Sequence, residues 1–430
     1  MNRLCFVLLI AMARAAWAQE PAPAPAPVPV PVPVPAPAPA RPQEEKVPDE
    51  AELKDIEAAL GADAEAKAEA AAPPRTGVGA ALASLAPDVA FTLDVAAAWF
   101  SDGEHLQTGG HDPTANGFNL QQLEMAVGKA VDPYFRFDAN LAFLADGVEI
   151  EEAYATTLAL PYGLQVRAGQ FLTRFGRLNA THLHAWDFVD QPFAIGRVFG
   201  GEGNRGLGAE VSYLTPAPFF LELVGSATNA GGEGTARSFF GASDLSVESP
   251  LDLQATLAVK EFFELSSDWS LATGQSFATG PNSTGRGNRT DVYGIDVYLK
   301  YRPITRGSHT IVALQTEWLW RRRQVPARLR EDLSGYAYAS WRFARRWGTA
   351  ARYELGRPSR DADGNTGDDL DPEWTRSRHR ATIALTFWPT EFSRLRVQGG
   401  VDVPRWLDAP IWSAFLAMEI SVGAHGAHKF

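Results

Sequence analysis

The chain of 430 residues contains a single cysteine, Cys5. It lies in an N-terminal segment with the pattern of a cleaved secretory signal: Arg3 near the start, an apolar run from Leu4 to Met12, and small residues at 16 and 18. We therefore expect residues 1–18 to be a signal peptide. The mature chain would then lack thiols, which excludes disulfides and cysteine-ligated metals and fits an oxidising periplasm. Because Cys5 lies well upstream of the cleavage position, a lipoprotein is disfavoured.

The sequence also lacks long hydrophobic runs. Beyond the signal, no window approaches the ~18 consecutive apolar residues that a membrane-spanning helix needs, which excludes a helical inner-membrane protein. Neither a Gly-x-Ser-x-Gly nucleophile elbow nor a His-Glu-x-x-His zinc motif occurs. His379 and Ser377 would share one face of a strand, but the sequence offers no evident third partner. We expect no enzymatic activity.

Positive charge is scarcer than negative charge, with 39 Lys and Arg against 51 Asp and Glu and a formal net charge of -12. An acidic balance of this kind disfavours nucleic acid as a partner. The hydrophobic fraction of 45% would suit a large soluble protein. The order of the residues is more informative than these averages.

Apolar and polar residues alternate in many short segments from Asp88 onward. The last of these places Leu416, Met418, Ile420 and Val422 on one face and Glu419, Ser421 and His425 on the other. A period of two indicates strands with one side in lipid and the other in water, and only a closed β-barrel crosses a membrane in that way. We predict an all-β fold in which residues 88–430 form a transmembrane antiparallel β-barrel of about 16 strands in the cell outer membrane.

A soluble β-sandwich or propeller also alternates, but it would rarely place Arg and Glu at successive inward positions. Aromatic residues near the strand ends favour the barrel, since they are typical of interfacial girdles; they are Trp99, Phe100, Tyr134, Tyr162, Trp269, Trp318, Trp320, Trp347, Trp388 and Trp412. The terminal Phe430 resembles the signature by which the barrel assembly machinery recognises its clients. Outer-membrane lipid and lipopolysaccharide are further expected partners.

Between the signal and the barrel, residues 19–48 form a Pro-, Ala- and Val-rich periplasmic linker that samples extended polyproline conformations and is expected to be disordered. Such an arm could contact the cell wall. Residues 49–72 are predicted to form a short acidic helix, followed by a linker at 73–87. The helix has only a thin apolar stripe, which fits a solvated helix; a small coiled coil or a periplasmic contact is the alternative.

Several motifs resemble those of a known family. Glu151-Glu152-Ala153-Tyr154, Gly169-Gln170-Phe171 and Gly206-Leu207-Gly208 look like the phosphate-selective porin O/P family. The stretch 315–318 (Gln-Thr-Glu-Trp) and the closing 423–428 (Gly-Ala-His-Gly-Ala-His) look like a subgroup often labelled zinc-regulated TonB-dependent outer-membrane receptors. A TonB-dependent transporter of the usual plan has a barrel of about 22 strands around a plug, for which this chain is too short. The resemblance therefore implies a porin, and a homotrimer is an open option.

If the resemblance holds, the long external connection from Leu172 to Asn204 folds inward and narrows the pore. Its charged residues, together with Arg205 at its exit, would form the constriction; they are Arg174, Arg177, His182, His184, Asp187, Asp190, Arg197 and Arg205. Further inward positions would line the lumen wall; they are Arg136, Arg167, Lys300, Glu317, Arg321, Arg352, Glu354, Arg380, Arg394 and Arg396. For most of these charges, wall solvation and salt bridging that stiffens the lumen is the favoured interpretation.

Basic rings attract anions, whereas opposing basic and acidic walls orient polar solutes. The near balance of charge favours a porin for passive diffusion of small hydrophilic solutes, with anionic solutes as the second possibility. Two other functions stay open: an outer-membrane anchoring or binding protein, and a receptor-like barrel involved in zinc uptake.

We expect no tightly bound cofactor, but two metal hypotheses arise. His182 and His184 could ligate zinc with Asp187 as a third donor, and His425 and His428 have similar spacing. Hard oxygen donors for calcium cluster in an acidic loop that holds Asp361, Asp363, Asn365 and Asp369 around a glycine. That loop lacks the spaced glutamate of an EF-hand.

Overall fold

The computed structural model describes residues 87–423 except 104, 146 and 306–308. The predicted signal peptide, Pro-rich linker and short helix lie outside the described residues, as do His425, His428 and the assembly signal Phe430. Among the residues described, no helix is long and apolar enough to cross a membrane.

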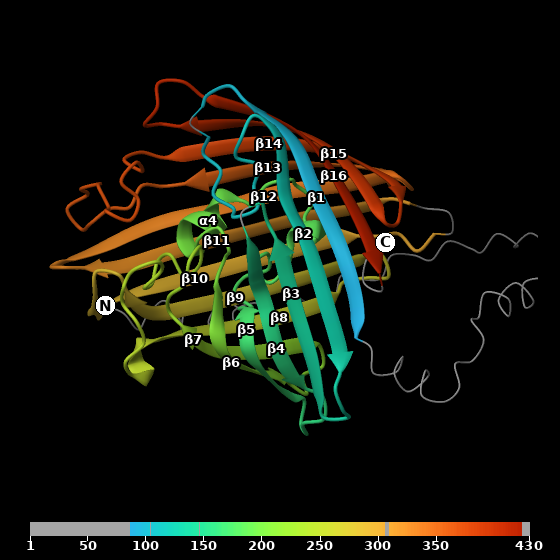
Figure 1. The fold of residues 1–430 in the computed structure, drawn as a ribbon, viewed down its shortest axis with the longest axis horizontal. Helices are drawn as coiled ribbons and strands as arrows, with labels where there is room; N and C mark the ends of the chain where they lie inside the picture. Colours follow the sequence, from blue (N-terminus) through green and yellow to red (C-terminus); the bar gives the residue numbers. More distant parts are fainter. Residues whose placement is uncertain (1–86, 104, 146, 306–308, 424–430) are drawn as a thin grey trace, which may run out of the picture. The chain divides into compact units, whose positions relative to one another are not determined.

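Sixteen antiparallel strands form a closed barrel in which each strand pairs with its neighbours in sequence (Figure 1). The ring closes where β1 pairs with β16, with Asp94 opposite Glu419. This confirms the predicted fold class and the estimate of about 16 strands. The strands are β1 (Asp88–Phe100), β2 (Gly117–Ala130), β3 (Phe135–Phe143), β4 (Val148–Thr157), β5 (Leu164–Leu172), β6 (Arg205–Leu214), β7 (Phe220–Asn229), β8 (Leu253–Glu264), β9 (Trp269–Asn282), β10 (Gly285–Tyr301), β11 (Ile311–Val325), β12 (Arg328–Ala344), β13 (Trp347–Gly356), β14 (Arg378–Thr390), β15 (Ser393–Pro404) and β16 (Ile411–Gly423).

The alternation in sequence sets which side chains point outward. On β1, Phe91 and Trp99 are 37% and 53% exposed on the outer face, whereas Asp94 and Ala96 are buried on the inner face. Two of the predicted girdle aromatics point inward instead. Phe100 is buried against Phe415, because it follows the inward parity of its strand. Trp388 likewise follows the inward parity of β14 and lines an interior cavity.

Short connections gather at the barrel end that holds the start of β1 and the end of β16; residues 131–134, 158–163 and 215–219 are examples. By the usual plan of these barrels, this end is periplasmic and the long loops face outward. We name the external loops by their order: L1 (101–116), L3 (173–204), L4 (230–252) and L7 (357–377). L3 carries two short helices, η2 (Leu183–Ala185) and α4 (Phe193–Phe199), and L4 ends in η3 (Pro250–Asp252).

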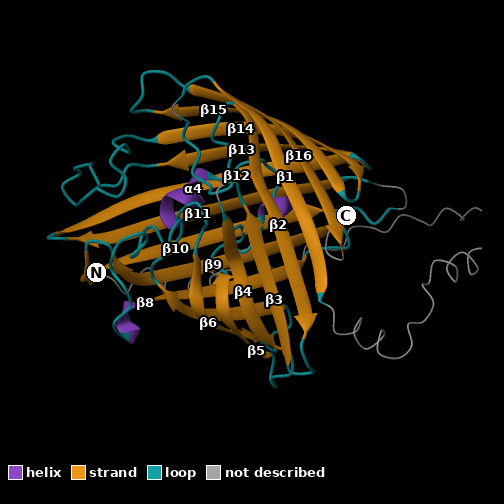
Figure 2. Ribbon diagram, viewed as in Figure 1, coloured by secondary structure: helices purple, strands orange, loops and turns teal. Residues whose placement is uncertain are grey.

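L3 lies inside the ring of strands, where α4 contacts β11, β12 and β13 (Figure 2). Every residue of α4 is buried. An apolar cluster forms here from L3, L4 and inward side chains of β9 to β12; it includes Phe175, Ile195, Phe199, Phe239, Phe240, Leu319 and Tyr336. The lumen is therefore not polar throughout, as the alternation alone suggests, because two loops bring an apolar core into it.

Candidate functional site

The start of L3 is held against the barrel wall from β6 to β11. Arg174 forms ion pairs with Glu210 on β6 (2.9 Å) and Glu222 on β7 (2.8 Å). The backbone N–H of Gly176 donates to Ser276 on β9 at 2.9 Å, and that of Leu178 donates to Glu317 on β11 at 3.3 Å. Gly176 has a positive φ of 59°, and a Cβ there would meet the end of the Glu317 side chain, so this turn favours glycine.

The middle of L3 is fixed by one buried carboxylate. Asp190 pairs with Arg352 on β13 at 2.8 Å and with Arg380 on β14 at 2.9 Å, and it accepts a hydrogen bond from Gln398 on β15 at 2.7 Å. Burial alone would raise the pKa of Asp190, but the two guanidinium groups hold it below its usual value. Three residues further on, the N–H of Phe193 donates to Glu354 at 2.7 Å.

Arg197 on α4 joins L3 to the outer loops. Its guanidinium pairs with Asp371 of L7 at 3.2 Å and lies 3.7 Å from the ring centre of Trp374. Asp371 also pairs with Arg321 on β11 and with Arg237 of L4. Burial would raise the pKa of Asp371, but Arg321, Arg197 and Arg237 lower it strongly. Asp371 lies two residues beyond Asp369 of the predicted acidic loop, and its carboxylate is held by these arginine partners.

The two predicted histidines of L3 face carboxylates on the wall of β2 and β4. His182 lies 3.0 Å from Glu152, and His184 lies 3.1 Å from Glu124. Their rings stack with centroids 5.9 Å apart. Asp187, the expected third zinc donor, lines a different cavity, because the chain turns after η2 and directs it toward Tyr338. The zinc site predicted with Asp187 is thus not assembled.

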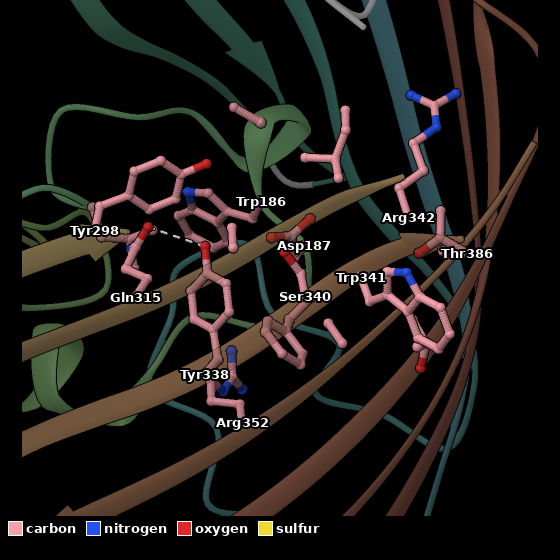
Figure 3. A pocket seen from close by; sticks show the side chains of 18 of the residues that line it. Trp186, Asp187, Tyr298, Gln315, Tyr338, Ser340, Trp341, Arg342, Arg352 and Thr386 are labelled. Carbon is pink, nitrogen blue, oxygen red and sulfur yellow. Dashed lines mark hydrogen bonds between the residues drawn. The ribbon is translucent and has the colours of Figure 1, made fainter. Parts of the chain in front are cut away.

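On the periplasmic side of L3, an interior cavity of about 340 Å³ opens against the wall of β10 to β14 (Figure 3). Arg177 stacks over the ring of Tyr298 at 3.8 Å and donates to Gln315, which also accepts a hydrogen bond from the Tyr338 hydroxyl at 3.0 Å. Asp187 and Lys300 line the same cavity.

A second cavity of about 300 Å³ lies at the periplasmic mouth and shares Ile311, Arg342 and Trp388 with the first. Its charged lining is mostly basic; it comprises Arg302, His309, Arg342, Arg345, Arg346 and Glu391. On the other side of L3, a cavity of about 560 Å³ is lined by residues of L3, L4 and L7. Its lining shares no residue with the first cavity. The two cavities are therefore lined by different parts of L3.

The predicted lumen-wall residues point inward, and most have ion-pair or hydrogen-bond partners. Arg136 pairs with Asp138 (2.7 Å), Arg167 with Glu210 (3.0 Å), and Arg394 with Glu419. Arg396 donates to the carbonyl of Trp186 in L3 at 2.8 Å. Salt bridging therefore accounts for many of these charges, whereas Lys300 lines the open cavity.

Arg205, predicted at the constriction, opens β6 and pairs with Glu149 on β4 and, at 3.5 Å, with Glu202. Beside it lies His111 of L1, which the sequence patterns did not single out. No motif spacing points to this residue; it reaches the site because L1 folds inward alongside L3. Gly201 of L3 accepts a backbone hydrogen bond from Gly110 at 3.1 Å and fixes that approach.

Two further predictions concern residues away from L3. The Asp361 carboxylate accepts hydrogen bonds from the N–H groups of Asp363 and Asn365, which closes the acidic loop on itself. A calcium ion there stays a prediction. Ser377 lies 3.2 Å from one ring nitrogen of His379, and the Tyr353 hydroxyl, not a carboxylate, meets the other at 2.7 Å.

Comparisons with known proteins agree with this architecture. No protein-family model matches the chain. Similar solved structures include the outer membrane channel DcaP of Acinetobacter baumannii (12% identity, TM-score 0.53, covering 78% of this chain and 97% of that one). An anion-selective porin from Comamonas acidovorans has 11% identity and a TM-score of 0.51, covering 78% and 99%. OprB of Pseudomonas putida has 11% identity and a TM-score of 0.51, covering 78% and 94%.

The closed barrel, its apolar outer face and these neighbours define an outer-membrane β-barrel with the porin fold. The chain belongs to the same family as an uncharacterized protein of Aquifex aeolicus (strain VF5), with 32% identity over 366 residues that cover 79% of this chain and 75% of the relative.

Proposed function

We propose that this protein is a porin through which small hydrophilic solutes, anions in particular, diffuse passively, and that L3 sets the width of the path. The observation that carries the proposal is the position of L3, which is bonded to inward side chains of strands on all sides of the ring and leaves a cavity of about 340 Å³ beneath it. A space of this size suits small molecules.

The balance of charge on the periplasmic side favours anions. Seven Lys or Arg side chains line the two adjoining cavities, against Asp187, Asp190 and, at the mouth, Glu391; the seven are Arg177, Lys300, Arg302, Arg342, Arg345, Arg346 and Arg352. Asp190 is already neutralised by two arginines. Rings of basic groups raise the local concentration of anions and lower that of cations. The resemblance to phosphate-selective porins is compatible with inorganic phosphate as one such solute.

Planar-bilayer recordings test this proposal. The purified protein should give stepwise ion currents, and a salt gradient should give a reversal potential on the anion-selective side. Lys300→Glu combined with Arg342→Glu should move the reversal potential toward cation selectivity. Arg328→Glu, which changes the same type of charge at the exposed outer turn, should have a much smaller effect.

The decisive negative result concerns L3. If the protein gives no stepwise currents, and variants that loosen L3 give none either, the porin proposal fails and the barrel is better explained as a binding or anchoring protein. If the barrel conducts but the double substitution leaves its reversal potential unchanged, the porin proposal stands and the proposed anion preference fails.

A further inference from the structure

Three segments that are distant in sequence bring metal-ligating side chains together at the outer side of L3. His111 comes from L1, Glu151 from β4 and Glu202 from the end of L3. The Nε2 atom of His111 lies 3.0 Å from Glu151 Oε1 and 3.4 Å from Glu202 Oε2. All three side chains are about nine-tenths buried. One imidazole and two carboxylates therefore converge in a shielded place.

A β-bulge brings Glu151 into this group. In the pairing of β3 with β4, Asn140 lies opposite Glu152 and Leu141 lies opposite Ile150, which leaves Glu151 without a partner in the register. The extra residue breaks the alternation, so Glu151 and Glu152 both point inward and both are buried. Bulges are known to redirect side chains next to functional sites.

His182 approaches Glu151 from the other side. Its Nδ1 atom lies 3.4 Å from Glu151 Oε2, while its Nε2 atom lies 3.0 Å from both Glu152 Oε2 and Asn140 Nδ2. Groups that hold one imidazole nitrogen while the other faces the site are typical of metal-ligating histidines. Glu124 lies further away, 4.0 Å from His182 Nδ1.

Two observations indicate a ligand at this point. His111 Nε2 and Glu151 Oε2 are buried and lie 3.0–3.4 Å from the facing groups of this cluster, yet neither makes a well-aligned hydrogen bond within residues 87–103, 105–145, 147–305 and 309–423. A small cavity of about 40 Å³ is lined by His111, Glu151, His182 and Glu202 together. Buried polar atoms normally form well-aligned hydrogen bonds, so donor atoms that converge beside a small shared cavity without such bonds are arranged as the ligands of an ion would be.

The spacing of the donor atoms fits a metal ion. In a tetrahedral site with metal–ligand bonds of about 2.0–2.2 Å, neighbouring ligand atoms are separated by roughly 3.3–3.6 Å. The three separations given above, from 3.0 to 3.4 Å, are close to that range, and Glu151 faces His111 with Oε1 and His182 with Oε2. Mixed imidazole and carboxylate donors suit divalent transition ions such as Zn²⁺ rather than Ca²⁺ or Mg²⁺.

We propose that His111, Glu151, Glu202 and His182 bind one divalent transition-metal ion, for which Zn²⁺ is the probe. The ion would join L1 and L3 to β4. The site differs from the zinc site predicted from sequence, since it retains His182 but replaces His184 and Asp187. It does not depend on whether the lumen conducts ions.

The test is metal binding by the untagged full-length protein in detergent after treatment with EDTA. Titration calorimetry with Zn²⁺ should give one tight equivalent. His111→Ala combined with Glu151→Gln should weaken that equivalent at least 100-fold. Asn140→Ala, which removes a positioning residue, should weaken it about 10- to 100-fold, as such outer partners do elsewhere. His379→Ala is the matched control, because it removes a histidine from the far β14 wall and should leave binding unchanged.

Two controls keep the result decisive. Heat-modifiable mobility on gels shows whether each variant has folded, and only folded variants are compared. X-ray absorption of the Zn²⁺-loaded wild type should show only nitrogen and oxygen ligands, including two imidazoles. The proposal is overturned if the double variant keeps the tight equivalent, or if the absorption spectrum shows fewer than two imidazoles. A wild type that takes up no tight equivalent also overturns it.

Discussion

Asp190 of L3 forms an ion pair of 2.8 Å with Arg352 on β13, and both side chains are almost completely buried within the barrel. A second guanidinium, from Arg380, completes the neutralisation. Breaking one partner of a buried pair is costly because it leaves an uncompensated charge. This contact therefore anchors the middle of L3, and it offers the most direct way to test what L3 does.

We expect Asp190→Asn to loosen L3 and to raise single-channel conductance. The same change should lower the free energy of unfolding by about 3 kcal/mol, because Arg352 and Arg380 lose a charged partner in a buried place. Bilayer recordings and thermal unfolding in detergent measure the two effects. Glu331→Gln is the control, since it breaks the exposed pair with Arg322 and should change neither quantity. Unchanged conductance in Asp190→Asn would contradict a restricting role for L3.

The same carboxylate predicts a dependence on acid. Because the pKa of Asp190 is lower in the folded protein, its stabilising contribution is fully present above the ordinary value of about 3.9 and is lost as pH falls below it. We expect the conductance controlled by Asp190 to stay constant down to about pH 3.9 and to rise only below it, because the folded protein keeps this carboxylate charged above its ordinary pKa. Asp190→Asn should flatten this rise.

Two arginines at the start of L3 should differ in their effect on selectivity. Arg174 is already neutralised by Glu210 and Glu222, whereas Arg177 contacts a ring and an amide beside the periplasmic cavity. Arg177→Ala should therefore weaken anion preference in reversal-potential measurements more than Arg174→Ala. Equal shifts in reversal potential from the two variants would show that ion pairs in the wall do not reduce the effect of an arginine on selectivity.

Gly176→Ala should destabilise the protein. Its φ of 59° costs an alanine about 1–2 kcal/mol, and the added methyl group also collides with Glu317. Thermal unfolding in detergent should occur at a lower temperature. Gly287→Ala is the matched control, because no atom lies within 4 Å of its added Cβ. A variant as stable as the wild type would mean that this turn of L3 can move freely.

Much of the barrel could be predicted from the sequence because alternation is a local property. The alternation within one strand shows which of its faces meets lipid. The inward positions of Asp94 and Glu210 could therefore be identified without knowledge of the adjacent strands. Exceptions such as Phe100 arise at strand ends, where an aromatic residue suits either the interface or the lumen. The pattern cannot distinguish these two positions.

The interior was less predictable because it depends on contacts between distant segments. The bulge at Glu151 needs the register of β3 against β4, which no single strand encodes. His111 and the apolar residues of L4 enter the lumen because their loops pack inward. Loops have no regular alternation of apolar and polar residues from which such packing could be predicted. The paired glutamates at 151 and 152 were visible as a motif, but their link to His111 was not.

L3 also has a mechanical consequence for the barrel. A cylinder of hydrogen-bonded strands can flatten in cross-section without breaking its ladders, since each strand is joined only to its two neighbours. L3 bonds to Glu152 on β4, Glu317 on β11 and Gln398 on β15, so it crosses the ring as an internal strut. Lateral pressure from the bilayer must then compress this loop before it can deform the cylinder.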